Sequence, residues 1–195
     1  MILSNNELNS QNLDEFNDLL NEYKQINVNY FIEIGSMYGW SLQHFIHYSN
    51  EGSTAISIDL PVRNFIGPND WRVEKQEYNY KHVWPMWAKS KKCKLYLIPD
   101  SSLNISTYTK VKEILNNNLL DFLFIDGDHR YESIKSDYNT YAQLVRPGGI
   151  IAFHDIGKNE EGGGKQFWSE IKHKFKYKEI TKDVNQEKGI GILYV

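Results

Sequence analysis

Apolar positions along the chain repeat in two ways, one typical of helices and one typical of buried strands. Near the N-terminus they recur at helical spacing from Leu13 to Ile26, with Asn12 as a cap, and predict a helix within residues 1–28. Short continuous apolar runs follow, at residues 30–35, 55–60, 94–100, 119–126 and 150–155. Runs of this kind are typical of strands buried on both faces of a parallel sheet.

Amphipathic segments separate these runs. Helical spacing predicts helices after the first strand, over 105–118, from Tyr131 to Val145 and after Gly164. Pro147-Gly148-Gly149 is predicted to end the third of them. The tail predicts two further strands, YKEIT and GIGILYV, joined by a polar turn. Alternating strands and helices indicate a parallel α/β sheet, with the last two strands as an antiparallel hairpin at one edge.

Residues 61–93 break this alternation. They contain Pro61, Pro68 and Pro85, many charges and several tryptophans and tyrosines, without a clean period. A long irregular connection in a compact domain usually serves a function or contains a short helix that the pattern hides. Packing is the commoner role for such aromatic residues, and a lid or substrate loop is the functional role that we expect for part of the segment.

Composition narrows the class of protein. The 195 residues predict a single domain over 1–195, and 41% hydrophobic with 24% charged residues exclude a disordered or membrane-embedded chain. The net charge of −3 gives no reason to expect a nucleic acid partner. Cys93 is the sole cysteine, which excludes a disulfide framework. The N-terminus has no basic, apolar leader, so we expect a cytoplasmic protein that binds no membrane.

Several residues that are suited to ligand binding follow the predicted strands. In parallel sheets, ligands bind beyond the carboxyl ends of the strands, where the strand order reverses. Gly35 and Gly39 follow the first strand and allow a tight turn into a helix N-terminus, which attracts anions. The spacing matches neither a dinucleotide fingerprint nor a P-loop. Asp59 closes the second strand and is placed to accept hydrogen bonds from ribose hydroxyls.

A second group of polar residues ends the fourth and fifth strands. Asp126 and Asp155 would repel each other unless they share a proton or bind a cation, and an oxygen-rich site suits Mg²⁺. His154 either adds a nitrogen ligand, which favours Mn²⁺, Fe²⁺ or Zn²⁺, or points away from the metal. The alternative is structural: Asp-Gly-Asp is a common turn, and His129 could simply begin the next helix.

The motifs EIGSMYGWS, SIDL, PDSS and FIDGDHRYESIKSDY, followed by LVRPGGIIAFHDI, together resemble class I S-adenosylmethionine-dependent methyltransferases. The closest branch is that of small O-methyltransferases related to macrolide-sugar methyltransferases and cephalosporin-hydroxylase-like proteins. The matching motifs run from Tyr30 to Ile156. The resemblance implies a Rossmann-like methyltransferase fold: a mostly parallel seven-stranded sheet in the order 3-2-1-4-5-7-6, its last strand antiparallel, with helices on both faces.

The resemblance also implies roles for individual residues. The methionine part of the cofactor would be lined by Glu33, Gly35, Ser36 and Gly39. Asp59 would hold the ribose, and Asp100 and Ser101 would flank the adenine. Asp126 and Asp155 would bind magnesium, His129 would act as general base, and Asp128 would support the turn. His154 stands where some relatives have Glu, which leaves its role and the identity of the metal open.

These observations favour metal-assisted O-methylation of a hydroxyl group on a small molecule such as a sugar. A hydroxyl is a weak nucleophile, so a bound cation and a nearby imidazole would have to remove its proton as the methyl group arrives. Two alternatives remain: a metal-dependent hydroxylase or hydrolase on the same fold, and a non-catalytic module that binds the cofactor or a partner. The sequence leaves open whether the chain forms a homo-oligomer.

Overall fold

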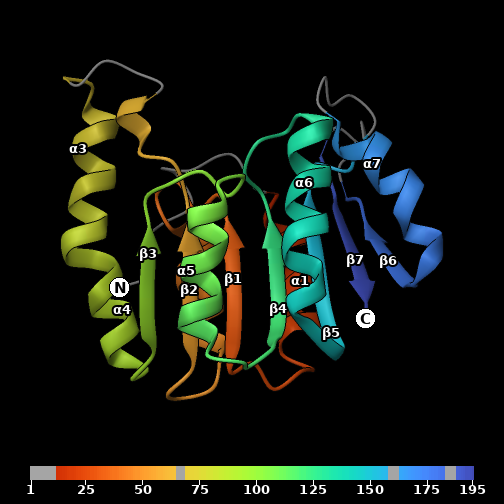
Figure 1. Cartoon of the computed structure of the whole chain (residues 1–195), viewed down its shortest axis with the longest axis horizontal. Coiled ribbons are helices and arrows are strands. Elements are labelled where there is room, and N and C mark those ends of the chain that lie inside the picture. Colours follow the sequence, from red (N-terminus) through yellow and green to blue (C-terminus); the bar gives the residue numbers. More distant parts are fainter. Residues whose placement is uncertain (1–11, 65–68, 158–162, 183–187) are drawn as a thin grey trace.

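A computed structural model describes residues 12–64, 69–157, 163–182 and 188–195. Within these residues the chain forms a seven-stranded sheet in the order β3-β2-β1-β4-β5-β7-β6 (Figure 1). The strands are β1 Tyr30–Ile34, β2 Thr54–Ile58, β3 Lys94–Ile98, β4 Leu120–Ile125, β5 Val145–His154, β6 Lys176–Ile180 and β7 Ile190–Tyr194. β7 pairs antiparallel with both β5 and β6, and the other pairs are parallel. The predicted strand order is confirmed.

Helices cover both faces of the sheet. One face packs against α1 Leu13–Tyr23, α2 Trp40–Tyr48 and α4 Trp84–Ser90. The opposite face packs against α5 Ile105–Leu115, α6 Tyr131–Tyr141 and α7 Gly164–Ile171 (Figure 1). Short 3-10 turns lie at η2 Val62–Asn64, η4 Ala142–Leu144 and η5 Lys172–Lys174. Among the described residues, no helix has the length and apolar character that crossing a bilayer requires.

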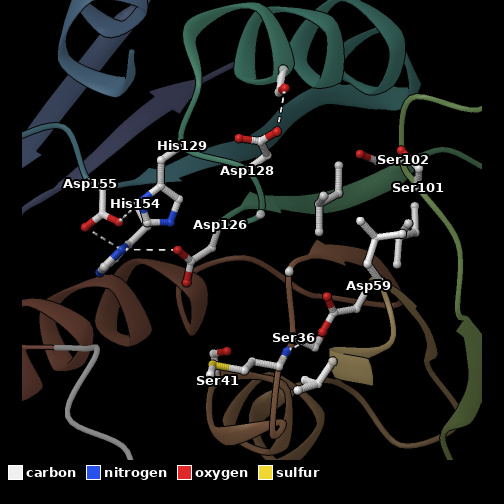
Figure 2. Close-up of a pocket in the computed structure, with 18 of the residues that line it drawn as sticks. Ser36, Ser41, Asp59, Ser101, Ser102, Asp126, Asp128, His129, His154 and Asp155 are labelled. Atoms are coloured by element: carbon white, nitrogen blue, oxygen red, sulfur yellow. Dashed lines mark hydrogen bonds and ion pairs between the residues drawn. The ribbon is translucent and has the colours of Figure 1, made fainter. Parts of the chain in front are cut away.

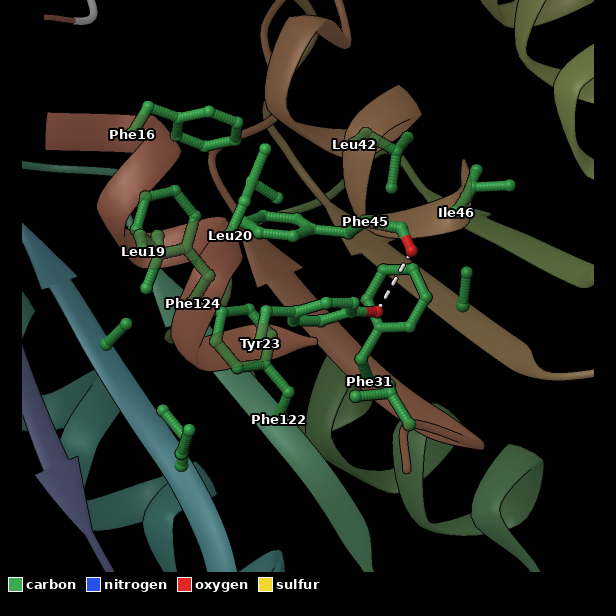
Figure 3. Packing of buried hydrophobic residues seen from close by; sticks show 14 of the residues in the cluster. Phe16, Leu19, Leu20, Tyr23, Phe31, Leu42, Phe45, Ile46, Phe122 and Phe124 are labelled. Carbon is green, nitrogen blue, oxygen red and sulfur yellow. Dashed lines mark hydrogen bonds between the residues drawn. The ribbon is translucent and has the colours of Figure 1, made fainter. Parts of the chain in front are cut away.

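Aromatic packing holds α1 and α2 against the centre of the sheet (Figure 3). Asn12 caps α1 as predicted, because its side chain accepts hydrogen bonds from the N–H groups of Asp14 and Glu15. Tyr23 is fully buried, and its ring lies 4.8 Å from that of Phe122 while its hydroxyl donates to the carbonyl of Phe45 at 2.9 Å. Burying each such side chain stabilises the fold by about 1.5–3 kcal/mol. This packing fixes the helix that follows the first strand.

Of the two explanations that the sequence left open for residues 61–93, the hidden helix is confirmed. Residues 71–90 are helical: α3 Trp71–Tyr78 runs through a π-helical turn, η3 Asn79–Val83, into α4. A π turn changes the number of residues per turn, so it displaces the apolar positions from a regular 3.6-residue spacing. Trp84 is fully buried and belongs to the same hydrophobic cluster as the core residues of α1 and α2. Residues 71–90 are therefore helical, and a lid or substrate-loop role for part of 61–93 stays a prediction.

The prediction that Pro147-Gly148-Gly149 ends the helix after Tyr131 was wrong. The helix already ends at the η4 turn, and β5 begins at Val145, so these three residues lie inside the strand. The pairing with β4 shifts there, from Leu120 opposite Val145 to Phe122 opposite Ile150. Gly148 takes φ +76, a left-handed conformation that suits glycine in such a bulge.

Candidate active site

A pocket of about 910 Å³ lies at the carboxyl ends of β1, β2, β4 and β5. Its lining includes most of the residues that were predicted to form the site: Gly35, Ser36, Asp59, Asp100, Ser101, Asp126, His129, His154 and Asp155. Figure 2 shows two groups on different sides, with Asp59, Ser36 and Ser101 apart from the cluster of Asp126 and the two histidines. One cavity thus joins the predicted cofactor residues to the predicted metal residues.

The glycine loop, residues 35–39 between β1 and α2, owes its shape to contacts within the protein. Gly35, Met37 and Gly39 all have positive φ, at 88, 48 and 84 degrees. A Cβ atom on Gly35 would lie 2.0 Å from the carbonyl oxygen of Asp126, and one on Gly39 would lie 2.3 Å from Nε1 of Trp84. Gly39 is not among the pocket residues, so its predicted contact with the cofactor has no support in the geometry.

Glu33 lies beneath the loop rather than in the pocket. It is fully buried, and its Oε2 accepts a 2.6 Å hydrogen bond from the Ser36 hydroxyl, which is 2.8 Å from the Ser57 hydroxyl. Burial, together with the nearby charges of Asp126 and Asp59, raises the pKa of Glu33 to about 8. Glu33 therefore supports the loop from below, and its predicted contact with the methionine moiety stays a prediction.

Asp59 links β2 to the same loop. Its Oδ2 accepts a hydrogen bond from the N–H of Met37 at 2.5 Å. Burial raises the pKa of Asp59 to about 6, although hydrogen bonds from backbone N–H groups oppose the effect. One carboxylate oxygen thus stabilises the strained Met37 conformation, while the residue itself lines the pocket.

Asp100 mainly organises the chain that follows β3. Its carboxylate accepts hydrogen bonds from the Ser101 N–H at 2.8 Å, from the Asn104 amide at 2.8 Å and from the Thr107 hydroxyl at 3.1 Å. The bond from Ser101 contributes most to the lowered pKa of Asp100. Asp100 therefore fixes the start of α5 and the position of Ser101 at the pocket wall.

The second group brings β4 and β5 together. His154 Nδ1 lies 3.2 Å from Asp126 Oδ1 and 2.9 Å from Asp155 Oδ1. His129 Nδ1 lies 3.2 Å from the other oxygen of Asp155. His154 is nearly inaccessible, the two carboxylates are largely buried, and His129 is half-exposed. Asp155 adopts φ +57, which turns its side chain back towards the end of β4.

Asp126, His154 and Asp155 have the donor set of a metal site. Each offers a ligand atom, and these atoms lie within 4.8 Å of one another. Although His154 Nδ1 is close to both carboxylates, neither ring nitrogen makes a well-aligned hydrogen bond to any of the residues that the structure describes. Buried polar atoms are rarely left in this way unless an ion or water completes the site. The residues fit a divalent cation that accepts mixed oxygen and nitrogen ligands.

The charges in this group also favour a cation. Burial lowers the pKa of His154, but the carboxylates of Asp126 and Asp155 outweigh it and raise the pKa to about 10. Burial raises the pKa of Asp155, and the His154 imidazole outweighs it, so the pKa lies below its usual value. A proton on His154 thus offsets one of the two carboxylate charges, and a metal ion that binds this imidazole would have to displace the proton.

Asp128 is a turn residue, as expected. It accepts hydrogen bonds from the Arg130 N–H at 3.0 Å and from the Ser133 hydroxyl at 2.8 Å, and so shapes the start of α6. The pocket is also lined by Tyr38, Arg72 and Lys188, for which the sequence predicted no role. Their positions in a glycine loop, a charged segment and a polar turn gave no distinctive signal.

Comparison with known proteins identifies the family. Residues 32–156 match the sequence profile of a family described as a methyltransferase domain. The chain belongs to this methyltransferase family. It is 28% identical over 143 residues to an uncharacterised protein of Acanthamoeba polyphaga mimivirus, a match that covers 71% of this chain and 56% of that protein. An uncharacterised protein of Sinorhizobium fredii is 31% identical over 72 residues, which is 36% of this chain and 8% of the relative. The chain spans little more than half of the first of these curated relatives and a small part of the second.

Solved structures of O-methyltransferases share the methyltransferase fold. The Bacillus cereus O-methyltransferase in complex with SAH superposes with a TM-score of 0.59 at 14% identity, covering 95% of this chain and 83% of that one. A putative caffeoyl-CoA O-methyltransferase from Staphylococcus aureus gives 0.63 at 16% identity, with 96% and 87% covered. TomG from Streptomyces achromogenes, in complex with SAM, gives 0.60 at 10% identity, with 95% and 82% covered. At these identities the likeness is one of fold.

Proposed function

We propose that this protein is an S-adenosylmethionine-dependent O-methyltransferase that acts with a divalent metal on a hydroxyl group of a small molecule, such as a sugar. The observation that carries the proposal is the single pocket with the glycine loop and Asp59 on one side and the Asp126, His154 and Asp155 group on the other. The family membership and the SAH and SAM complexes of structural neighbours support the choice of cofactor.

The cofactor half consists of the loop, Asp59 and the start of α2. The first N–H groups of a helix have no partners within it, and the glycine at the cap of α2 supplies no side-chain hydrogen bond. Trp40 and Ser41 of this first turn line the pocket, so the helix presents its positive end to an anionic group such as a carboxylate. Bound S-adenosylmethionine would supply an activated methyl group on its sulfonium.

The metal half would hold the cation through Asp126, Asp155 and His154. A cation there would lower the pKa of an acceptor hydroxyl and fix its orientation. Two carboxylates suit Mg²⁺, which the resemblance to O-methyltransferases favours, whereas the imidazole of His154 favours Mn²⁺ or Fe²⁺. The buried histidine therefore makes the metal preference a measurable property of this site.

His129 would take the proton from the acceptor hydroxyl. Asp155 lies against Nδ1 of its ring, so the carboxylate favours the tautomer with a proton on Nδ1 and leaves Nε2 as the basic nitrogen. Half of the His129 side chain is exposed, and it lines the pocket, so an acceptor can reach it. Asp155 would thus orient the base through Oδ2 and bind the metal through Oδ1.

Titration calorimetry with S-adenosylmethionine tests the proposal, followed by methyl transfer to a panel of sugars and other alcohols with and without EDTA. We expect wild-type protein to bind S-adenosylmethionine and Asp59→Ala to bind it at least about tenfold more weakly. Asp14→Ala is the control, since Asp14 is exposed on α1 and outside the pocket. Metal binding without cofactor binding would point to a hydrolase or hydroxylase, and cofactor binding without transfer to a non-catalytic module.

A further inference from the structure

The carbonyl oxygen of Tyr38, inside the glycine loop, accepts hydrogen bonds from two buried side chains. Asn79 Nδ2 donates to it at 3.0 Å, and Trp84 Nε1 donates to it at 3.1 Å. The neighbouring carbonyl of Met37 accepts a third bond, from Gln76 Nε2 at 3.3 Å. All three donors come from the helical segment 71–90, so hydrogen bonds from this segment fix the backbone of the glycine loop.

The π-helical turn makes this arrangement possible. Asn79 and Trp84 are five residues apart, and in a regular α-helix they would face different directions. In η3 the backbone N–H of Trp84 bonds to the carbonyl of Asn79, so the two residues lie one above the other. Both side chains can then reach the same oxygen. Turns of this type inside helices are often found at functional sites.

Trp84 also fills the space beside Gly39. A Cβ atom on Gly39 would lie only 2.3 Å from its Nε1, and the Trp84 side chain is fully buried. Next to it, Met37 has a left-handed backbone conformation that costs a non-glycine residue about 1–2 kcal/mol. The loop keeps this conformation because Asp59 holds the N–H of Met37 and Gln76 holds its carbonyl.

We infer that Asn79 and Trp84 are positioning residues that keep the glycine loop in its ligand-binding conformation. Neither residue lines the pocket, so both act through Tyr38 and Gly39. The choice of S-adenosylmethionine as the ligand in the test rests on the proposed function. The effect of the two residues on the loop conformation does not depend on it. If the loop also samples other conformations, only a fraction of the protein molecules can bind the ligand. The apparent affinity of the protein for the ligand then falls in proportion to that fraction.

Two tryptophans on one helix provide a matched test. Trp84→Phe removes the N–H that bonds to Tyr38, whereas Trp87→Phe removes an indole N–H that is buried and has no partner among the described residues. We expect amide hydrogen exchange of residues 35–39 to be about three- to tenfold faster in Trp84→Phe, the effect of one hydrogen bond, and unchanged in Trp87→Phe. The dissociation constant for S-adenosylmethionine should rise by the same factor only in Trp84→Phe.

Asn79→Ala provides an independent variant if Trp84→Phe folds poorly. Asn79 and Trp84 donate to the same oxygen, so the double variant Asn79→Ala/Trp84→Phe removes both of these hydrogen bonds to the buried carbonyl of Tyr38. The increase in exchange rate in the double variant should therefore exceed the product of the increases in the two single variants. With an accepted substrate, KM for S-adenosylmethionine should rise while kcat at saturation is retained, which a loss of folded protein would not produce. Equal exchange and equal affinity in the Trp84 and Trp87 variants would overturn the inference. If wild-type protein binds no S-adenosylmethionine, the proposed function fails, and the exchange experiment still decides the inference.

Discussion

The buried carboxyl of Glu33 should make the stability of this protein fall as pH rises. Its pKa is about 8 in the folded protein because of burial, against a usual value of 4.5 in an unfolded chain. Between these values the folded state keeps a proton that the unfolded state has released. The stabilisation is therefore complete below pH 4.5 and is lost as the pH rises through about 8.

The size of the effect follows from the two pKa values. The difference between 4.5 and about 8, at about 1.36 kcal/mol per pKa unit, gives about 5 kcal/mol over the full range. About 3 kcal/mol of this falls between pH 5.5 and pH 8.5. Glu33→Gln keeps the shape of the neutral side chain and still accepts the Ser36 hydrogen bond, but it cannot ionise. The variant should therefore lose most of this pH dependence.

Urea unfolding at pH 5.5 and pH 8.5, without ligand, measures the difference. Asp59 and Asp137 also have pKa values raised by burial to about 6, and they add a slope of the same sign in both proteins, so the comparison isolates Glu33. Glu113→Gln, at an exposed position on α5, serves as the control. If Glu33→Gln keeps the wild-type change in unfolding free energy between the two pH values, the protonated, buried state of Glu33 is refuted.

Three further predictions concern the loop and the metal group. Gly35→Ala should destabilise the protein by about 1–3 kcal/mol more than Gly52→Ala in thermal unfolding, because both glycines have positive φ but only at Gly35 would the new Cβ meet backbone. Equal losses would exclude the steric argument. Asp126→Asn should weaken Mn²⁺ binding at least tenfold by calorimetry while sparing S-adenosylmethionine, and an unchanged metal affinity would remove Asp126 as a ligand. His129→Ala should lower kcat about 10²- to 10⁴-fold with little change in cofactor affinity, and full activity would exclude it as the base.

Much of the fold could be read from the apolar pattern, since strands buried on both faces leave a continuous signal. β4 is the clearest case: every one of its residues is buried, and it lies at the centre of the sheet as its composition predicts. The segment 71–90 escaped prediction because its π turn breaks the helical period. Pro147-Gly148-Gly149 was misassigned because these residues suit a helix stop and a strand bulge equally well.

Some residues of the candidate site could likewise be located from the sequence, and others could not. The sequence located Asp59, Asp126 and Asp155, because a parallel sheet brings the carboxyl ends of its strands to one edge. It could not show that Glu33 lies beneath the loop or that Gly39 faces Trp84, and their predicted contacts with the cofactor stay predictions. Those positions depend on how β1 packs beneath the loop and on how Trp84 reaches Gly39 from a distant segment, and local sequence does not encode such contacts.

The sequence by itself determined the alternation of strands and helices and the two groups of polar residues at the strand ends, and the strand order came from the resemblance to methyltransferases. Periodicity is a local constraint, and it acts before any side chain meets its partner. Only the tertiary structure placed His154 between two carboxylates, put Glu33 under the loop and clamped Tyr38 through Asn79 and Trp84. These are contacts between distant segments, set by packing, and their energies depend on burial that exists only once the chain has folded.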